Sequence, residues 1–283
     1  MTQSAPPLPM HPMADGVRLA LRHWEPTGTP RGTVLIVHGL GEHSGRYPHV
    51  AAYLTARDWR VVAYDLRGHG PSEGRRGSIA HADDHLRDLT TIVDLVRSRP
   101  DYLVPDTRLL LFGHSMGGAF AAQFMARAIR SIDGLILSSP ALDPGLTAFQ
   151  RMQLRLGMAL MPGLALPNQL AVDRLSHDPA VVADYQADPL VHDRVTPRLA
   201  QAIVDAGEEV IAQAPQWRTP TLLLWAGDDH NVAPAGSARF AAHAPSDQVT
   251  ARVFPAMYHE IFAEPDADLV FTALGDWLDR RFT

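Results

Sequence analysis

Two hydrophobic patterns alternate along the first half of the chain. Short, continuous apolar runs lie at 34–37, 61–64, 109–112 and 135–137. Each run is too short for a helix and ends in turn residues, which is typical of strands covered on both faces of a parallel sheet. Between the runs, residues 81–99 and 116–130 place apolar or small side chains at helical spacing. This alternation predicts βαβ units with right-handed crossovers.

The pattern changes at the start and in the middle of the chain. Residues 15–24 alternate apolar and polar positions, which predicts an antiparallel edge strand with one solvated face. Residues 142–215 lack a strand-like run. There Phe149, Met152 and Leu156 recur at helical spacing, as in the core of a helical cap or the wall of a tunnel.

Beyond residue 215 the strand pattern resumes at 221–225 and 249–254, and a helix over about 266–281 closes the chain. The simplest organisation is one α/β domain with a mostly parallel central sheet flanked by helices. We expect residues 1–141 and 216–283 to form this core, and residues 142–215 to be a helical cap inserted into it.

Composition excludes several kinds of chemistry. The net charge of -6 gives no electrostatic footprint for nucleic acid. All 25 basic residues are arginine, so Schiff-base chemistry and a Walker-type phosphate loop, which need lysine, are excluded. The absence of cysteine removes disulfides, thiolate metal sites and cysteine nucleophiles.

The start of the chain does not resemble a targeting segment. Residues Met1–Met13 are rich in proline and lack the basic and apolar regions of a signal peptide. No window reaches about 18 uninterrupted apolar residues. We therefore expect a cytoplasmic protein.

The candidate nucleophile is Ser115, in the sequence Gly113-His114-Ser115-Met116-Gly117. This Gly-x-Ser-x-Gly motif follows the predicted strand 109–112 directly and precedes the predicted helix 116–130. A sharp strand-to-helix turn of this kind lifts the serine hydroxyl above the sheet. It also places the hydroxyl at a helix amino terminus, whose dipole favours developing negative charge.

A serine nucleophile also needs backbone donors for the oxyanion, each contributing on the order of 3 kcal/mol. One expected donor is the amide of Met116, the residue after the nucleophile. The other is expected in the glycine-rich loop after the strand 34–37, where we favour the amide of Leu40. His38 in this loop is interpreted as a hydrogen-bonded loop former, with a ligand or base as the alternative.

The acid and the base are expected after two later strands, in the order Ser, Asp, His. The sequence after 221–225 offers Asp228 and Asp229, and the sequence after 249–254 offers His259. We favour Asp229, because Val232 can anchor its loop, and we interpret Asp228 as a loop hydrogen-bond acceptor. A buried aspartate on His259 would fix its tautomer and stabilise the imidazolium.

Three longer motifs resemble the monoacylglycerol lipase and lysophospholipase branch (serine aminopeptidase S33-like) of the α/β-hydrolases. They read His38-Gly39-x-Gly41-Glu42-His43-Ser44-x-Arg46-Tyr47, Asp65-x-Arg67-Gly68-His69-Gly70-x-Ser72-x-Gly74 and Gly113-His114-Ser115-Met116-Gly117-Gly118. The sequence Asp188-Pro189-Leu190-Val191 is similar to a cap motif of the same branch. The resemblance spans residues 15–280 and implies an α/β-hydrolase fold.

The resemblance implies a cap over an apolar acyl tunnel, with transient contact between the cap and lipid aggregates or a membrane surface. It also implies polar head-group residues at Glu42, Arg46, His114 and Tyr185. A structural salt bridge between Glu42 and Arg46, or simple packing of Tyr185, is the alternative for those residues. No metal or organic cofactor is implied, and the oligomeric state is left open.

These features predict a serine carboxylester hydrolase that acts on monoacylglycerols. A lysophospholipase or a broad-specificity carboxylesterase is the nearest alternative. Aminopeptidase activity is less favoured, because the acidic residues of the segment 142–215 are scattered along the sequence. A non-enzymatic scaffold is disfavoured by the joint presence of the serine, acid and base.

Overall fold

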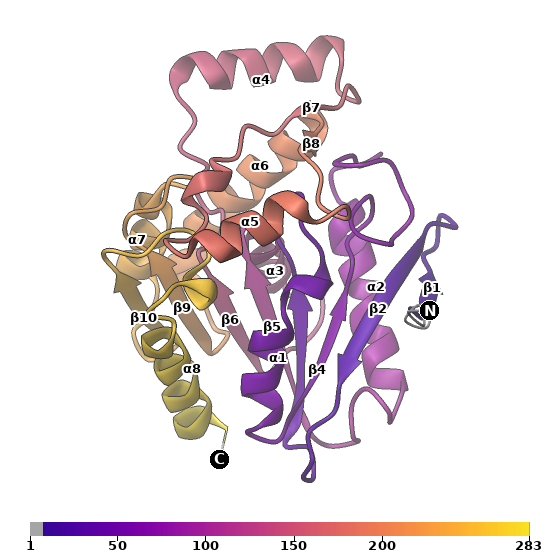
Figure 1. Cartoon of the computed structure of the whole chain (residues 1–283), viewed down its shortest axis with the longest axis vertical. Coiled ribbons are helices and arrows are strands. Elements are labelled where there is room, and N and C mark those ends of the chain that lie inside the picture. The colour runs from indigo at the N-terminus through magenta and orange to yellow at the C-terminus, as the bar shows by residue number, and fades with distance from the viewer. Residues whose placement is uncertain (1–7, 283) are drawn as a thin grey trace.

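An eight-stranded sheet forms the centre of the computed structural model, which describes residues 8–282 (Figure 1). The strands are β1 (Met10–Pro12), β2 (Arg18–Trp24), β3 (Gly32–Val37), β4 (Trp59–Tyr64), β5 (Arg108–His114), β6 (Gly134–Ser138), β9 (Thr221–Ala226) and β10 (Val249–Phe254). Their order in the sheet is β1-β2-β4-β3-β5-β6-β9-β10. From β4 to β10 every pairing is parallel, which confirms the predicted mostly parallel sheet.

The amino-terminal end of the sheet differs from the prediction in one respect. Strand β2 is antiparallel to β4, as expected, but it is not the edge, because β1 pairs with its other side. Strand β1 has only three residues and ends in Pro12, so it leaves no periodic signal in the sequence. Residues 1–7 of the stretch interpreted as lacking a signal peptide lie outside the described residues.

Helices cover both faces of the sheet. They are α1 (Pro48–Thr55), α2 (Asp84–Ser98), α3 (Ser115–Ala126), α4 (Ala148–Leu160), α5 (Pro179–Ala187), α6 (Pro197–Gln213), α7 (Pro234–His243) and α8 (Asp268–Arg281). The predicted helix 116–130 ends earlier, at Ala126, because the backbone turns left-handed at Ala128 with φ of 49°. Helix α1, which begins at Pro48, was not predicted from the apolar pattern.

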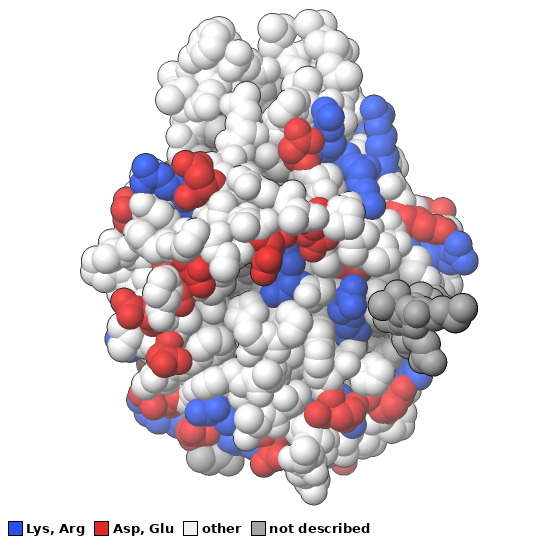
Figure 2. Space-filling model, viewed as in Figure 1, with Lys and Arg blue, Asp and Glu red and all other residues white. Residues whose placement is uncertain are grey.

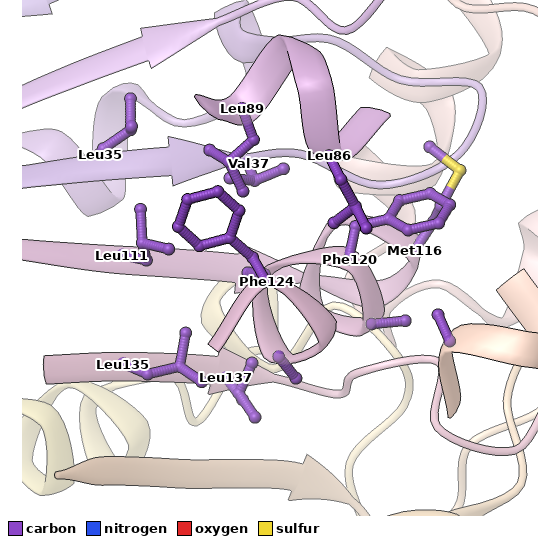
Figure 3. Close-up of a cluster of buried hydrophobic side chains, with 14 of the residues drawn as sticks. Leu35, Val37, Leu86, Leu89, Leu111, Met116, Phe120, Phe124, Leu135 and Leu137 are labelled. Carbon is purple, nitrogen blue, oxygen red and sulfur yellow. The ribbon is translucent and has the colours of Figure 1, made fainter. Parts of the chain in front are cut away.

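The continuous apolar runs arise because each strand serves two cores. In β3, Leu35 and Val37 join a cluster with α2 and α3, whereas Val34 and Ile36 join a second cluster with α1 and α8. Figure 3 shows the first cluster, in which Phe124 of α3 lies near Val37 and Leu111 of the strands and Phe120 lies near Leu86 of α2. All these side chains are almost completely buried. Burying a side chain of this size contributes about 1.5–3 kcal/mol, so both layers stabilise the sheet.

The segment 142–215 supplies no strand to the main sheet. It contains α4, α5, α6 and a small antiparallel pair of β7 (Leu166–Pro167) and β8 (Arg194–Val195). Helix α6 packs against α3 of the core, with residues such as Leu199 and Ala206 fully buried. Helix α4 lies at the top of Figure 1, beyond α6.

Helix α4 corrects one expectation. Its predicted apolar stripe was interpreted as cap core or tunnel wall, yet Phe149, Met152 and Leu156 are 62%, 56% and 59% exposed. No residue of this helix is buried. The helical period was therefore read correctly, but the apolar face points to solvent in this structure. Separately, no helix within residues 8–282 has the length and apolar character needed to cross a membrane.

Candidate active site

The candidate nucleophile occupies the turn between β5 and α3. Strand β5 ends at His114, and Ser115 begins α3 with a left-handed φ of 52°, a conformation that is strained for a residue with a Cβ. A side chain at Gly117 would overlap the backbone carbonyl oxygens of Val37 and His38. Glycine is therefore required for α3 to approach the end of β3 this closely.

A buried carboxylate and imidazole lie at the carboxyl ends of β9 and β10. Nδ1 of His259 lies 2.7 Å from Oδ2 of Asp229, and the two side chains are 4% and 1% exposed. The other carboxylate oxygen accepts the backbone amides of Asn231 at 2.8 Å and Val232 at 3.0 Å. An ionised carboxylate only accepts hydrogen bonds, so Nδ1 of His259 carries the proton and Nε2 keeps its lone pair.

The neighbouring carboxylate, Asp228, lies elsewhere. Its side chain is 55% exposed and pairs with His230 at 3.2 Å. The structure therefore brings Asp229, and not Asp228, to His259. Asp228 and Asp229 are adjacent in the sequence, so the conformation of the loop after β9 determines which of the two carboxylates is buried.

The electrostatics of the buried pair suit a base. Burial acts to lower the pKa of His259, but the charge and hydrogen bond of Asp229 outweigh it and raise the pKa above the ordinary 6.5. Burial acts to raise the pKa of Asp229, but His259 and the loop amides outweigh it and lower that pKa. Asp229 is thus held ionised and His259 is a stronger base than free imidazole.

His114 connects the nucleophile turn to the base. Its ring centroid lies 4.8 Å from that of His259, and its Nδ1 lies 3.1 Å from the carbonyl oxygen of Ser138. Burial, with a smaller contribution from His259, lowers the pKa of His114 to about 4. His114 is therefore a neutral neighbour of His259 at pH 7, and Ser115 is the next residue of the chain.

The two expected oxyanion donors belong to the start of α3 and to the loop after β3, and both segments lie next to Ser115. Met116 is the second residue of α3, so its amide is among those without a partner inside the helix. Leu40 lies in the loop after β3, next to Gly39. A Cβ added at Gly39 would lie 3.2 Å from Cβ of Ser115, which shows how closely this loop passes the nucleophile.

Three of the four residues expected to bind a polar head group, Glu42, Arg46 and Tyr185, lie together in a largely buried cluster around Arg46. Nη2 of Arg46 lies 2.8 Å and 2.7 Å from the two carboxylate oxygens of Glu260, and its Nε lies 3.4 Å from Oε2 of Glu42. The guanidinium carbon of Arg46 lies 4.7 Å from the ring centroid of Tyr185, a cation–π distance. Arg46 thus contacts Glu260, Glu42 and Tyr185.

Glu260 was not among the predicted site residues. The only signal for it in the sequence is its position directly after the predicted base, and the pairing with Arg46 spans 214 residues of sequence. Burial raises the pKa of Glu260. Burial acts in the same direction on Glu42, but the charges of His114 and Arg46 lower the pKa of Glu42 overall.

A cavity of about 530 Å³ opens beside this cluster. Among the residues that line it are Glu42, Arg46, His114, Glu260, Phe262 and Phe271. Glu42 and Arg46 come from the segment after β3, His114 from the end of β5 and Glu260 from the loop after β10. The phenylalanines come from η4 (Ile261–Ala263) and α8. Tyr185 lines a neighbouring pocket on the side of the segment 142–215. In the described part of the chain, no group of three or more His, Asp or Glu side chains is placed to hold a metal ion.

Comparison with known proteins gives matches over nearly the whole chain. A monoacylglycerol lipase of Mycolicibacterium smegmatis is 35% identical over 270 residues, which cover 93% of each chain. The crystal structure of Paleococcus ferrophilus monoacylglycerol lipase has a TM-score of 0.80 at 34% identity, covering 92% of this chain and 98% of that one.

A further solved structure supports the fold. It is a soluble variant of monoglyceride lipase from Saccharomyces cerevisiae in complex with a substrate analog, with a TM-score of 0.87 at 24% identity, covering 100% of this chain and 98% of that one. The family model described as "Serine aminopeptidase, S33" matches residues 28–266. The chain therefore belongs to the serine aminopeptidase S33 family, and its fold is that of the α/β-hydrolases.

Proposed function

We propose that this protein is a serine carboxylester hydrolase that cleaves monoacylglycerols into glycerol and a fatty acid. The observation that carries the proposal is the buried Asp229–His259 pair, which lies beside the strand-to-helix turn that bears Ser115. The sequence similarity to monoacylglycerol lipases, which extends over more than nine-tenths of the chain, supports the choice of substrate.

The proposed reaction passes through an acyl-enzyme. The Ser115 hydroxyl attacks the ester carbonyl while Nε2 of His259 takes its proton, and Asp229 stabilises the resulting imidazolium. The amides of Leu40 and Met116 hold the oxyanion. His259 then donates its proton to the departing glycerol oxygen, leaving the acyl group on Ser115. Water, activated by His259, releases the fatty acid by the same route.

The head group is proposed to bind at the cavity beside the base. Glu42, Arg46 and His114 line this cavity, and Tyr185 supports Arg46 from the other side. A glycerol moiety has hydroxyl groups that both donate and accept, so a carboxylate and a guanidinium in one wall suit it. The link between Arg46 and Glu260 fixes the guanidinium in place before substrate arrives.

We further propose that residues 142–215 act as a cap on a core formed by residues 1–141 and 216–283, and that the cap contacts lipid surfaces. Figure 2 shows the top of the molecule, over α4, free of charged side chains in this view. Exposed apolar side chains gather on α4 and just after it: Phe149, Met152, Leu156, Leu160, Met161 and Leu164. Contiguous apolar surface of this kind suits contact with the insoluble substrate of a lipase.

A cytoplasmic location is also proposed, supported by the absence of cysteine, which suits a reducing compartment. The aminopeptidase alternative would need a free carboxylate for the substrate amine. In the lining of the cavity the glutamates are engaged: Glu260 by Arg46, Glu42 by Gly39 and Tyr47, and Glu264 by backbone amides. Asp184 and Asp188 line the same cavity, so its carboxylates do not separate the two alternatives, and the preference for an ester substrate is supported by the similarity to monoacylglycerol lipases.

A hydrolysis profile tests the proposal. The enzyme is assayed on monoacylglycerols of increasing chain length, a lysophosphatidylcholine, p-nitrophenyl butyrate and an aminoacyl amide, with Ser115→Ala as the control. We expect the highest kcat/KM on a monoacylglycerol and a loss of several orders of magnitude in Ser115→Ala without loss of the fold. A higher kcat/KM on the lysophospholipid or on the amide would overturn the substrate assignment. Unchanged turnover by Ser115→Ala would overturn the mechanism.

A further inference from the structure

His38 is a completely buried histidine that the proposed reaction does not use. It follows β3 directly, at the start of the loop that carries Leu40. The backbone amide of Leu66 lies 2.9 Å from its Nε2, and the carbonyl oxygen of Gly39 lies 2.8 Å from its Nδ1. Both ring nitrogens therefore have one backbone partner each.

These two partners determine the protonation of the ring. A backbone amide can only donate, so Nε2 of His38 must accept from Leu66 and carry no proton. A carbonyl can only accept, so Nδ1 carries the proton and donates to Gly39. Burial lowers the pKa of His38, which keeps this neutral form at pH 7. The ring thus has one tautomer and one orientation.

The bond to Gly39 has a consequence for Leu40. The carbonyl of Gly39 and the amide of Leu40 belong to one planar peptide, and in a trans peptide they point in opposite directions. No peptide bond in the described residues is cis. When the imidazole holds the carbonyl, it therefore also sets the direction of the Leu40 amide, which is the proposed oxyanion donor.

The preceding peptide is held from the other side. Oε1 of Glu42 accepts the amide of Gly39 at 2.5 Å and the hydroxyl of Tyr47 at 2.7 Å. Both peptides that meet at the Gly39 Cα are thus fixed. Glycine is the residue with the greatest backbone freedom, so without these bonds this point of the loop would rotate most easily.

We infer that His38 is a positioning residue for the oxyanion hole: through the Gly39 carbonyl it aims the Leu40 amide at the reacting carbonyl, without itself touching the substrate. This inference rests on the proposed ester hydrolysis. The alternative is that His38 only ties the end of β3 to the loop after β4, through Leu66. The two roles use different ring nitrogens, so they can be separated.

Three substitutions of His38 distinguish the positioning role from the structural role. An asparagine amide reaches roughly the place of Nδ1, so His38→Asn keeps a donor for the Gly39 carbonyl and loses the acceptor for Leu66. A glutamine amide reaches roughly the place of Nε2, so His38→Gln keeps the acceptor for Leu66 and loses the donor for Gly39. His38→Ala removes both bonds.

For each variant, kcat and KM are measured on a monoacylglycerol, and the midpoint of thermal unfolding is measured separately. Loss of an oxyanion donor costs about 10²–10³ in kcat, so we expect His38→Ala to lose on the order of 10–100-fold with little change in KM. His38→Asn should recover most of that kcat, whereas His38→Gln should recover thermal stability but not kcat. Recovery of kcat by His38→Gln and not by His38→Asn, or an effect on KM instead of kcat, would overturn the inference.

Two controls keep the outcome decisive. If the variants do not fold, ¹⁵N NMR of histidine-labelled wild-type protein is used instead: a hydrogen-bonded proton on Nδ1 of His38 supports the inference, whereas an Nδ1 proton without a hydrogen bond, or a proton on Nε2, overturns it. If the wild-type enzyme cleaves p-nitrophenyl butyrate but not monoacylglycerols, the substrate assignment fails. The same three variants are then compared on p-nitrophenyl butyrate, because an oxyanion hole serves any ester.

Discussion

Replacing Asp229 by asparagine tests the proposed base through its tautomer. In the wild-type protein one carboxylate oxygen accepts two backbone amides and the other accepts Nδ1–H of His259. Asparagine has one accepting oxygen and one donating NH₂. The two backbone amides can only donate, so they claim the oxygen and the NH₂ faces His259. The imidazole must then accept at Nδ1 and carry its proton on Nε2, where the serine proton has to go.

The expected loss follows from this inversion. The wrong tautomer in a serine triad lowers kcat about 10⁴-fold, which corresponds to about 5.4 kcal/mol of transition-state free energy. The assay is kcat on a monoacylglycerol, with thermal unfolding measured in parallel. The matched control is Asp228→Asn, whose side chain is exposed and pairs with His230, and we expect its kcat within about 2-fold of wild type. Retention of more than about a tenth of kcat by Asp229→Asn, or an equal loss in Asp228→Asn, would refute the reasoning.

Three further predictions follow from single features of the structure. Burial acts to lower the pKa of His259, but its carboxylate partner raises that pKa above 6.5 overall. A protonated imidazole cannot accept the serine proton, so kcat/KM should fall as the pH drops through a midpoint above 6.5. A pH–rate profile with a lower midpoint would contradict this. Gly117→Ala should lower the free energy of unfolding by about 1–3 kcal/mol in denaturant titrations, because the added methyl would overlap two carbonyl oxygens. The control Gly163→Ala has open space around it and should change that free energy by no more than about 0.5 kcal/mol. Equal effects of the two substitutions would count against the close approach of α3 to β3. Leu156→Gln on α4 should weaken sedimentation with phosphatidylcholine vesicles, whereas Leu269→Gln, a 50% exposed leucine on α8, should not; the reverse order would argue against α4 as the lipid-facing surface.

Most of the fold could be predicted from local patterns. The central strands β3, β4, β5 and β6 were visible because they are buried on both faces, so their apolar runs are continuous. The nucleophile turn was visible because its glycines are required by close backbone approach, as at Gly117. Such constraints restrict the residue type at each position, so they leave a signature in a single sequence even where the contact is distant.

Features that depend on tertiary placement could not be predicted in this way. The partnership of Glu260 with Arg46 joins segments 214 residues apart, and no spacing rule connects them. The preference for Asp229 over Asp228 was predicted from Val232 in the same loop, but the turn that buries Asp229 and exposes Asp228 was not. The helical period over 148–160 was visible, but whether its apolar face meets protein or solvent depends on what lies beside α4.

The central claim is that Ser115 carries the acyl group during turnover. The direct measurement is intact-protein and peptide mass spectrometry after rapid acid quench of the enzyme with a long-chain monoacylglycerol. We expect a mass increase of one fatty acid less one water, located on the peptide that contains Ser115 and absent from Ser115→Ala. An acyl group on another residue, or full turnover with no acylated protein at any quench time and unchanged activity of Ser115→Ala, would contradict the account.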